Sequence, residues 1–233
     1  MWNIIAWAYI ILALLSAPYL LKQVIKYPQR MKIMNAVWVL TALWASVLAI
    51  WAYLRFGQTN SSKEGSGNGM KMNMGSMEGM NMNSDRPLWE KTILSSLHCG
   101  AGCTLADLIG ESFGYLFLRN ISGWSVGWQW GLDYLLALLI GVGFQYAAIH
   151  KMTKLSAAAT AFKALKIDFL SLTAWQLGMY CFMYVVFFIS PGVILTANQI
   201  IFWAVMQLAM LTGFVFAYPV NLILIRSGYK PSM

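Results

Sequence analysis

Two segments of the sequence are rich in ligands for soft metal ions. Residues His98 to Cys103 read HCGAGC, which places one imidazole and two thiols within six positions. Upstream, six of thirteen consecutive residues are methionines, namely Met70, Met72, Met74, Met77, Met80 and Met82. Thioether and thiolate sulfur both favour Cu(I), the softest common biological cation. The two segments therefore predict the handling of Cu(I), with Ag(I) and Hg(II) as alternative soft ions.

A set of four potential ligands recurs at intervals of four residues, and its members are Cys99, Cys103, Asp107 and Glu111. On a helix with about 3.6 residues per turn, this spacing forms one gently rotating stripe. Ionisable side chains inside a membrane span are costly and usually face the bundle interior or a water-filled path. We therefore expect the cysteines to bind the metal, and Asp107 and Glu111 to balance its charge or to relay protons.

His98 directly precedes Cys99, so on a regular helix the two side chains diverge by about 100°. Joint ligation of one ion needs a distorted first helical turn, which Gly100 and Gly102 would permit. The opposing interpretation is that the glycines allow close helix packing and the cysteines act as small apolar residues. The sequence leaves both interpretations open.

Two methionine pairs with a spacing of four residues add further thioether ligands. Met179 and Met183 flank Cys181, and Met206 and Met210 lie in the last apolar segment. Residues four apart are neighbours on one face of a helix. Methionine also fills packing gaps in helix cores, so these five residues are predicted either to extend a soft-ligand path or to pack the core.

The composition indicates an integral membrane protein. Of the 233 residues, 59% are hydrophobic and only 10% are charged, whereas about a quarter of the residues in soluble domains are charged. The net charge of +8 comes from Lys and Arg in short connections, without the basic, aromatic-interleaved domain of a nucleic-acid-binding protein. The expected partner is therefore the anionic lipid bilayer, and nucleic acid is excluded.

Other protein classes lack the motifs that would identify them. The three cysteines all lie in apolar sequence, which does not match an extracellular disulfide framework. No nucleophile elbow, phosphate-binding glycine loop or HExxH zinc motif occurs. A transporter or metal-binding protein is therefore favoured over an enzyme.

The hydropathy pattern predicts an all-α, polytopic membrane helix bundle with six transmembrane helices. The six apolar runs are Ile4 to Leu21, Ile33 to Leu54, Ile93 to Leu118, Trp128 to Ile149, Ile167 to Ile189 and Gln199 to Leu224. The first run lacks a basic n-region and a small-residue cleavage site, so it is read as a retained span. Residues 1–56 would form a two-helix hairpin, residues 57–88 a flexible Met-rich segment, and residues 89–233 a four-helix core.

The orientation in the membrane depends on the number of spans. With six spans, the basic residues around positions 22–32 and 151–166 lie on opposite sides, and the remaining Lys and Arg place both termini in the cytoplasm. With five spans and a re-entrant third segment, both basic clusters face inward and the Met-rich segment faces outward. Met-rich clusters suit oxidising compartments, which favours the second arrangement.

Several polar residues inside or beside the spans are expected to hydrogen-bond between helices, because lipid offers them no partner. They are Gln145, Asp168, Gln176, Gln199, Gln207 and Asn221.

From His98 onward, the chain resembles a bacterial membrane family known as domain of unknown function 4396. The resemblance rests on HCGAGCTLADLIGE (98–111), GFQY (143–146), DFLSLTAWQLGM (168–179), MQLAMLTGF (206–214) and YPVNLILIRSGYK (218–230). It covers the last four predicted spans and implies a fold but no activity. Residues 1 to about 90, including the Met-rich segment, lie outside it.

The leading hypothesis is a Cu(I) transporter or permease-like protein of the bacterial plasma (inner) membrane. The Met-rich segment would capture the ion, from a soluble copper chaperone or from solution, and pass it to Cys99 and Cys103. The first alternative is a membrane thiol–disulfide or electron-transfer protein that cycles these two cysteines. The second is a structural accessory subunit of a metal-resistance assembly. Gly110 and Gly114 would also suit helix pairing in a homo-oligomer.

Overall fold

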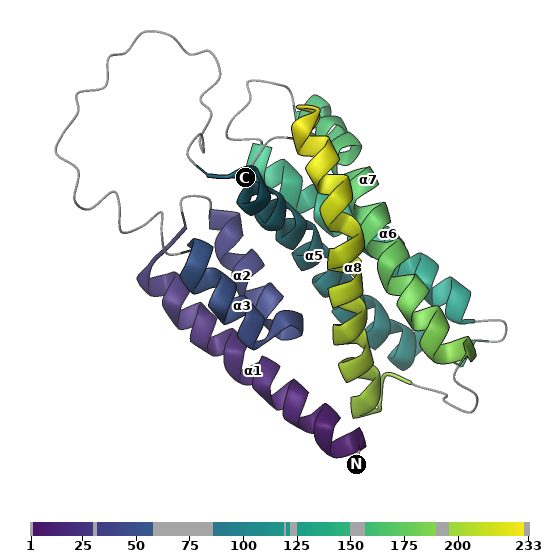
Figure 1. Cartoon of the computed structure of the whole chain (residues 1–233). Coiled ribbons are helices and arrows are strands. Elements are labelled where there is room, and N and C mark those ends of the chain that lie inside the picture. Colours follow the sequence, from purple (N-terminus) through teal and green to yellow (C-terminus); the bar gives the residue numbers. More distant parts are fainter. Residues whose placement is uncertain are drawn as a thin grey trace, which may run out of the picture.

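The computed structural model describes residues 2–29, 32–57, 86–118, 120–121, 125–149, 157–189 and 196–230. Every regular element in these ranges is a helix, and the helices form one bundle (Figure 1). Five of them are long and apolar enough to cross a membrane: α1 (Trp2–Lys26), α5 (Leu88–Phe113), α6 (Val126–Ile149), α7 (Ala157–Tyr184) and α8 (Ile200–Arg226). Two short π-helical turns, η2 (Gly114–Leu118) and η3 (Val185–Ile189), extend α5 and α7. The prediction of a helical membrane bundle is confirmed.

The second predicted span is not one helix. The run from Ile33 to Leu54 is divided into α2 (Lys32–Ala45), α3 (Val47–Ala52) and the π-helical turn η1 (Tyr53–Gly57). Between α2 and α3, Ser46 has φ 48° and ψ −119°, a backbone conformation that residues other than glycine rarely adopt. With 14 residues, α2 is about 21 Å long, which is too short to cross about 30 Å of hydrocarbon.

The α2–α3 pair enters and leaves the bundle at the same end. The side-chain amide of Gln29, just before α2, donates to the backbone carbonyl of Gly57 at 2.9 Å. The hydroxyl of Tyr53 donates to the backbone carbonyl of Tyr27 at 3.2 Å. At the turn between the helices, the hydroxyl of Ser46 lies 3.5 Å from that of Ser16, in the middle of α1. Residues 32–57 are therefore a re-entrant hairpin whose tip lies halfway across the bundle. Hydropathy could not reveal this, because both arms are equally apolar.

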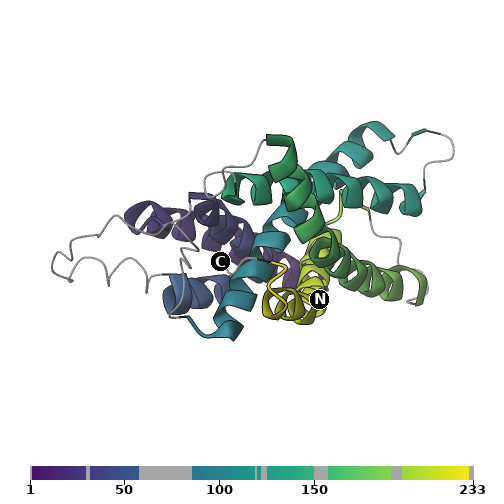
Figure 2. The ribbon, with the colours of Figure 1, turned by 90° about the horizontal axis from the view of Figure 1, so that it is seen from above.

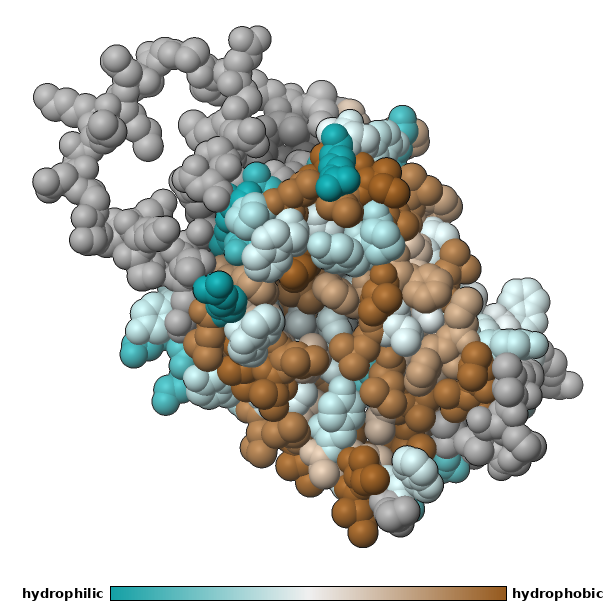
Figure 3. Space-filling model, in the orientation of Figure 1, coloured by the Kyte–Doolittle hydropathy of each residue, from teal (hydrophilic) through white to brown (hydrophobic). Residues whose placement is uncertain are grey.

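With this hairpin, the long helices alternate in direction, and the basic residues gather at one end. The Lys and Arg side chains that the structure describes all lie in or beside the last turns of α1, η1 and α8 or the first turns of α5 and α7, at what we call the basic end. They are Lys22, Lys26, Arg55, Arg86, Lys91, Lys166, Arg226 and Lys230. Figure 3 shows hydrophobic residues covering the middle of one face. The cancelling charge clusters predicted from six spans are therefore not found.

Helix α5 is the central element, since it contacts α2, α6, α7 and α8. Seen from above, α2 and α3 lie to one side of α6 and α7, whereas the N-terminus of α1 lies at α8 (Figure 2). Most of α5 is buried, from Thr92 near its start to Glu111 near its end. The described residues thus place the HCGAGC motif and the stripe of ligands in the interior of the bundle.

Candidate functional site

The HCGAGC motif lies inside α5, about ten residues after the helix begins at Leu88, and not at its head. Its two glycines allow close packing. A Cβ atom on Gly100 would lie 2.4 Å from the ring of Trp175, and one on Gly102 would lie 3.2 Å from the Cα of Gly141. The motif therefore remains a regular helix that α6 and α7 approach closely, and the expected distortion of its first turn does not occur.

His98 points away from Cys99, because the helix is regular at this point. Its ring packs edge-on against Phe144 of α6, with 6.0 Å between the centroids. The side chain is buried, and neither ring nitrogen has a hydrogen-bond partner among the described residues. The structure does not bring His98 together with Cys99 as two ligands of one ion.

Cys99 belongs to a buried polar cluster between α5, α7 and α8. Its Sγ lies 2.9 Å from the hydroxyl of Ser171, 3.2 Å from the Nζ of Lys230 and 3.8 Å from Oδ1 of Asp168. The Oδ1 of Asn221 accepts hydrogen bonds from Ser171 at 2.9 Å and from Lys230 at 2.9 Å. We call Cys99, Asp168, Ser171, Asn221 and Lys230 the Cys99 cluster.

Lys230 reaches this cluster because the chain turns back after α8. Gly228, with φ 69°, follows the last helical turn, and the amide of Lys230 donates to the carbonyl of Leu224 at 3.0 Å. The Lys230 ammonium forms a 3.2 Å ion pair with Asp168, and both side chains are completely buried. Burial alone would lower the pKa of Lys230, but Cys99 and Asp168 raise it, and the net pKa shift is upward. Sequence reasoning missed Lys230, since a single lysine near the C-terminus has no distinguishing pattern.

The acidic part of the predicted stripe continues along α5 away from the basic end. Asp107 and Glu111 are both buried, as predicted. Glu111 and Asp133 of α6 are close neighbours, and the side-chain amide of Gln129 donates to Asp133 at 3.1 Å. Two neighbouring buried carboxyl groups repel each other when both are ionised, so this pair is suited to hold one proton. Asp133 was not among the predicted site residues.

Gly110 and Gly114 serve contacts within this chain. A Cβ atom on Gly110 would lie 2.0 Å from the carboxylate of Asp133, and one on Gly114 would lie 1.9 Å from the amide of Gln129. Helix α6 of the same chain therefore packs on the face of α5 that was predicted to pair with a helix of a second copy.

A cavity of about 190 Å³ lies beside the tip of the re-entrant hairpin. Its lining includes Trp44, Thr104, Asp107, Met206, Gln207 and Met210, together with apolar residues of α1. The amide of Gln207 donates to the carbonyl of Leu43 at 2.6 Å. Oδ2 of Asp107 and Oε1 of Gln207 are buried acceptors without a hydrogen-bond partner among the described residues. The accessible wall of the cavity is almost wholly apolar, and the two unpartnered oxygens of Asp107 and Gln207 are buried behind it.

The helical methionines of both predicted pairs are buried, with exposed fractions of 1% for Met179, 2% for Met183, 8% for Met206 and 3% for Met210. Cys181 lies on the outer surface, so it shares no face with its flanking methionines. Cys99 and Cys103 are buried free thiols. The methionines from Met70 to Met82 lie outside the described residues. Among the described residues, no group of three or more His, Cys, Asp and Glu side chains is arranged to hold a metal ion.

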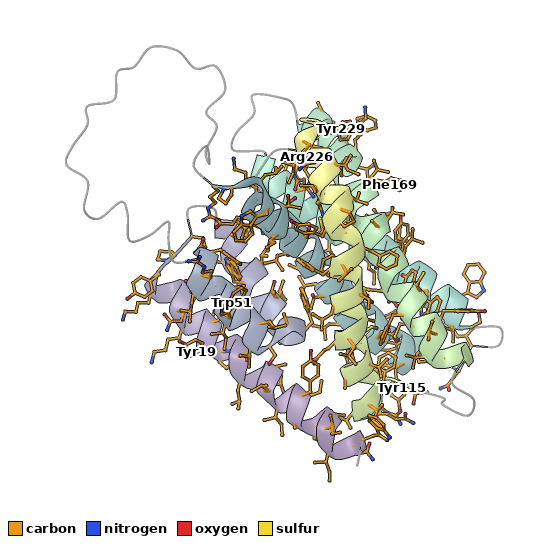
Figure 4. All side chains as sticks on the ribbon, viewed as in Figure 1. Tyr19, Trp51, Tyr115, Phe169, Arg226 and Tyr229 are labelled. Atoms are coloured by element: carbon orange, nitrogen blue, oxygen red, sulfur yellow. The ribbon has the colours of Figure 1, made fainter. Side chains whose placement is uncertain are left out.

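The expected interhelical hydrogen bonds form in part. Asn221, Asp168 and Gln207 each bond to other helices or to the C-terminal turn. Gln145 and Gln176 are buried, but their side-chain atoms have no partner in the part of the chain that the structure describes. Figure 4 shows Arg226 and Tyr229 at the same end as Phe169 of α7, with Tyr115 at the opposite end. The Cys99 cluster therefore lies nearer the basic end, and Asp107, Glu111 and Asp133 lie nearer the other end.

A family model described as a domain of unknown function (DUF4396) matches residues 88–230, which is more than half of the chain. The match spans α5 to the C-terminal turn and includes both the motif and Lys230. No curated protein matches the chain. No solved structure matches it either.

Proposed function

We propose that this chain, which belongs to the DUF4396 family, moves a soft monovalent cation, Cu(I), through the core of its helix bundle. The description of the family names no activity. The observation that carries this proposal is the cavity beside the re-entrant hairpin. Met206 and Met210 were predicted as one pair of ligands and Asp107 as a path residue from a separate part of the sequence, and all three line the cavity.

The chemistry of the cavity supports a cation. Asp107 and Gln207 each keep a buried acceptor oxygen without a donor behind the cavity wall, and a positive charge would compensate these oxygens if the side chains turned towards it. Two thioethers beside them favour a soft ion over Na⁺ or Mg²⁺.

The hairpin supports a binding site at this depth. Non-helical backbone inside a membrane is tolerated only where protein buries it or where it lines a water-filled cavity. Broken helices that end near the bilayer midplane are a recurrent feature of transporter binding sites. The break at Ser46 follows Trp44, a residue of the cavity wall, by only two positions.

The stripe on α5 supplies the rest of the path. Cys103 precedes Asp107 by one helical turn, and Cys99 precedes Cys103 by another. An ion would pass between the cavity and the Cys99 cluster by exchange among sites with few sulfur ligands. The Glu111–Asp133 pair would accept or release a proton as the charge passes.

The distribution of basic residues supports an orientation in the bacterial plasma membrane. Lys and Arg in short connections favour the cytoplasmic side, so the basic end and the C-terminus would face the cytoplasm. The segment that carries Met70 to Met82 joins Gly57 to Arg86, both at this end. We infer that it meets Cu(I) on the cytoplasmic side, contrary to the orientation that oxidising conditions favoured.

Copper binding to the purified protein tests the proposal. Full-length protein in detergent, kept anaerobic, competes with a cuprous chelator for Cu(I), and Met206→Leu/Met210→Leu and Asp107→Asn are compared with wild type. We expect both variants to bind Cu(I) at least tenfold more weakly. Met34→Leu, which alters a buried methionine away from the cavity, is the matched control. Equal Cu(I) affinity in all four proteins would refute the proposal.

A further inference from the structure

The ammonium group of Lys230 occupies a position that a metal cation would suit. Its Nζ lies within 3.5 Å of four acceptors: Asn221 Oδ1 at 2.9 Å, Cys99 Sγ at 3.2 Å, Asp168 Oδ1 at 3.2 Å and Ser171 Oγ at 3.5 Å. These acceptors come from α5, α7 and α8. An ammonium has only three N–H donors, so it cannot donate a separate hydrogen bond to each of these four acceptors. Their arrangement around one positive charge resembles the ligand set of a metal ion.

The burial of Lys230 sets it apart from the other basic residues. Its exposed fraction is 1%, whereas every other Lys or Arg side chain that the structure describes is exposed or only partly buried. A buried ammonium is retained only where its charge is compensated. Asp168 compensates it through Oδ1, while Asp168 Oδ2 is buried without a hydrogen-bond partner among the described residues. The four acceptors thus retain unused capacity for a cation.

Lys230 is also attached to the bundle by a short segment. Only three residues separate it from Arg226, the last residue of α8, and the segment is held by the hydrogen bond from the backbone amide of Lys230 to the carbonyl of Leu224. Gly228 supplies the positive φ that turns the chain. Withdrawal of Lys230 therefore requires only this terminal turn to open, without movement of a spanning helix.

We propose that Cys99, Asp168, Ser171 and Asn221 form a binding site for a soft monovalent cation, and that Lys230 fills this site as a tethered cation until the ion displaces it. The inference rests on the proposed function in that it names how ion entry at Cys99 is controlled. When Cu(I) or Ag(I) enters, Cys99 binds it as a thiolate, and the thiol proton is released to the solvent. The ammonium leaves the bundle with the C-terminal turn, so two positive charges, the ammonium and the thiol proton, leave as one metal ion enters, and the occupied site keeps the negative charge of Asp168.

The first test compares Ag(I) and Cu(I) affinity in full-length wild type, Lys230→Met and Lys230→Met/Cys99→Ser. We expect Lys230→Met to bind at least tenfold more tightly, because the competing charge is gone, and the added Cys99→Ser to abolish this gain. Lys22→Met, which removes an exposed lysine at the same end, should match wild type. Equal affinity in Lys230→Met and wild type would overturn the inference.

A second measurement uses the wild type alone, because Lys230→Met leaves a buried carboxylate unpaired, which destabilises the fold. An amine-reactive reagent modifies Lys230, and mass spectrometry measures the extent with and without Ag(I). We expect saturating Ag(I) to raise modification of Lys230 several-fold without changing that of Lys22. Unchanged modification under saturation would contradict displacement.

The two proposals fail in different ways. If Met206→Leu/Met210→Leu loses Cu(I) while Lys230→Met leaves the affinity unchanged, the cavity stands and the tethered-cation site is wrong. If Lys230→Met gains binding that depends on Cys99 while the cavity variants match wild type, the tethered-cation site stands and the proposed transport site is wrong.

Discussion

The Nζ of Lys230 lies 3.2 Å from the Sγ of Cys99, although the two residues are 131 positions apart in the sequence. This contact ties the C-terminal turn to the centre of the HCGAGC motif. It also makes the motif part of a charged cluster that spans three helices.

Neutralising Asp168 should destabilise the protein more than removing both members of the ion pair. Asp168→Asn leaves the Lys230 ammonium buried without its charged partner, which costs about 3–5 kcal/mol. In Asp168→Asn/Lys230→Met no charge remains to be compensated, so the loss should be smaller. Thermal unfolding of the purified protein in detergent measures the loss of stability in the single and the double variant. Glu90→Gln, which neutralises a different carboxylate, is the control. An unfolding temperature of the double variant below that of Asp168→Asn would contradict the ion pair.

The Lys230–Asp168 pair should stabilise the protein throughout the neutral range. The pKa of Lys230 is raised above its ordinary value of 10.5, so the stabilisation is fully present below pH 10.5 and is lost as the pH rises through the folded-state value. The difference in unfolding temperature between wild type and Lys230→Met should therefore be constant from about pH 7 to 9. A difference that vanished within this range would show that Lys230 is not held as an ammonium.

The re-entrant hairpin predicts that Lys26 and Lys91 are accessible from the same side of the membrane. In a background with Cys99, Cys103 and Cys181 replaced by Ser, single cysteines at Lys26 and Lys91 are labelled in sealed vesicles with a membrane-impermeant maleimide. Both should react from the same side. Ile121, at the opposite end among the described residues, provides the control position. Labelling of Lys26 and Lys91 from opposite sides would mean that residues 33–54 cross the membrane.

The unusual backbone at Ser46 gives a direct test of the hairpin tip. Ser46→Gly should preserve or raise the unfolding temperature, because glycine adopts φ 48° without the cost of about 1–2 kcal/mol that a left-handed conformation imposes on other residues. Ser46→Val should lower it, since a β-branched side chain is poorly compatible with positive φ. The opposite order of the two variants would show that the helix is continuous at this position.

Close packing at Gly102 predicts a position-dependent effect of added methyl groups. In Gly102→Ala the new Cβ lies 3.2 Å from the backbone of Gly141, so α5 and α6 must separate, and the unfolding temperature should fall. Gly143→Ala is the matched control, because a Cβ there meets nothing within 4 Å. It should be neutral or stabilising by up to about 1 kcal/mol. Equal effects at both positions would contradict the close approach of the two helices.

The sequence predicted the parts of the fold that depend on local pattern. Hydropathy identified the five spanning helices, and the spacing of four residues correctly placed Cys99, Cys103, Asp107 and Glu111 inside the bundle. The same spacing placed each methionine pair on a buried face. These predictions succeeded because helical periodicity alone decides which residues share a face.

The remaining features depend on contacts between residues far apart in the sequence. The break at Ser46 lies in uninterrupted apolar sequence, so hydropathy gave a single span where the chain turns back. The partners of Cys99 come from α7, α8 and the C-terminal turn, and no local pattern relates them. His98 was taken as a ligand from its proximity in sequence, but a regular helix directs it to Phe144 instead. Asp133 became a candidate only when α6 was seen to cross α5 at Gly110.

The most direct test of the central claim is ion flux into sealed proteoliposomes. Wild type, Asp107→Asn, Met206→Leu/Met210→Leu and Met34→Leu are reconstituted, and anaerobic Cu(I) entry is followed with a cuprous chelator trapped inside. We predict flux well above that of protein-free liposomes for wild type and Met34→Leu, and a loss of at least tenfold for the two cavity variants. Wild-type flux equal to that of protein-free liposomes would contradict the account.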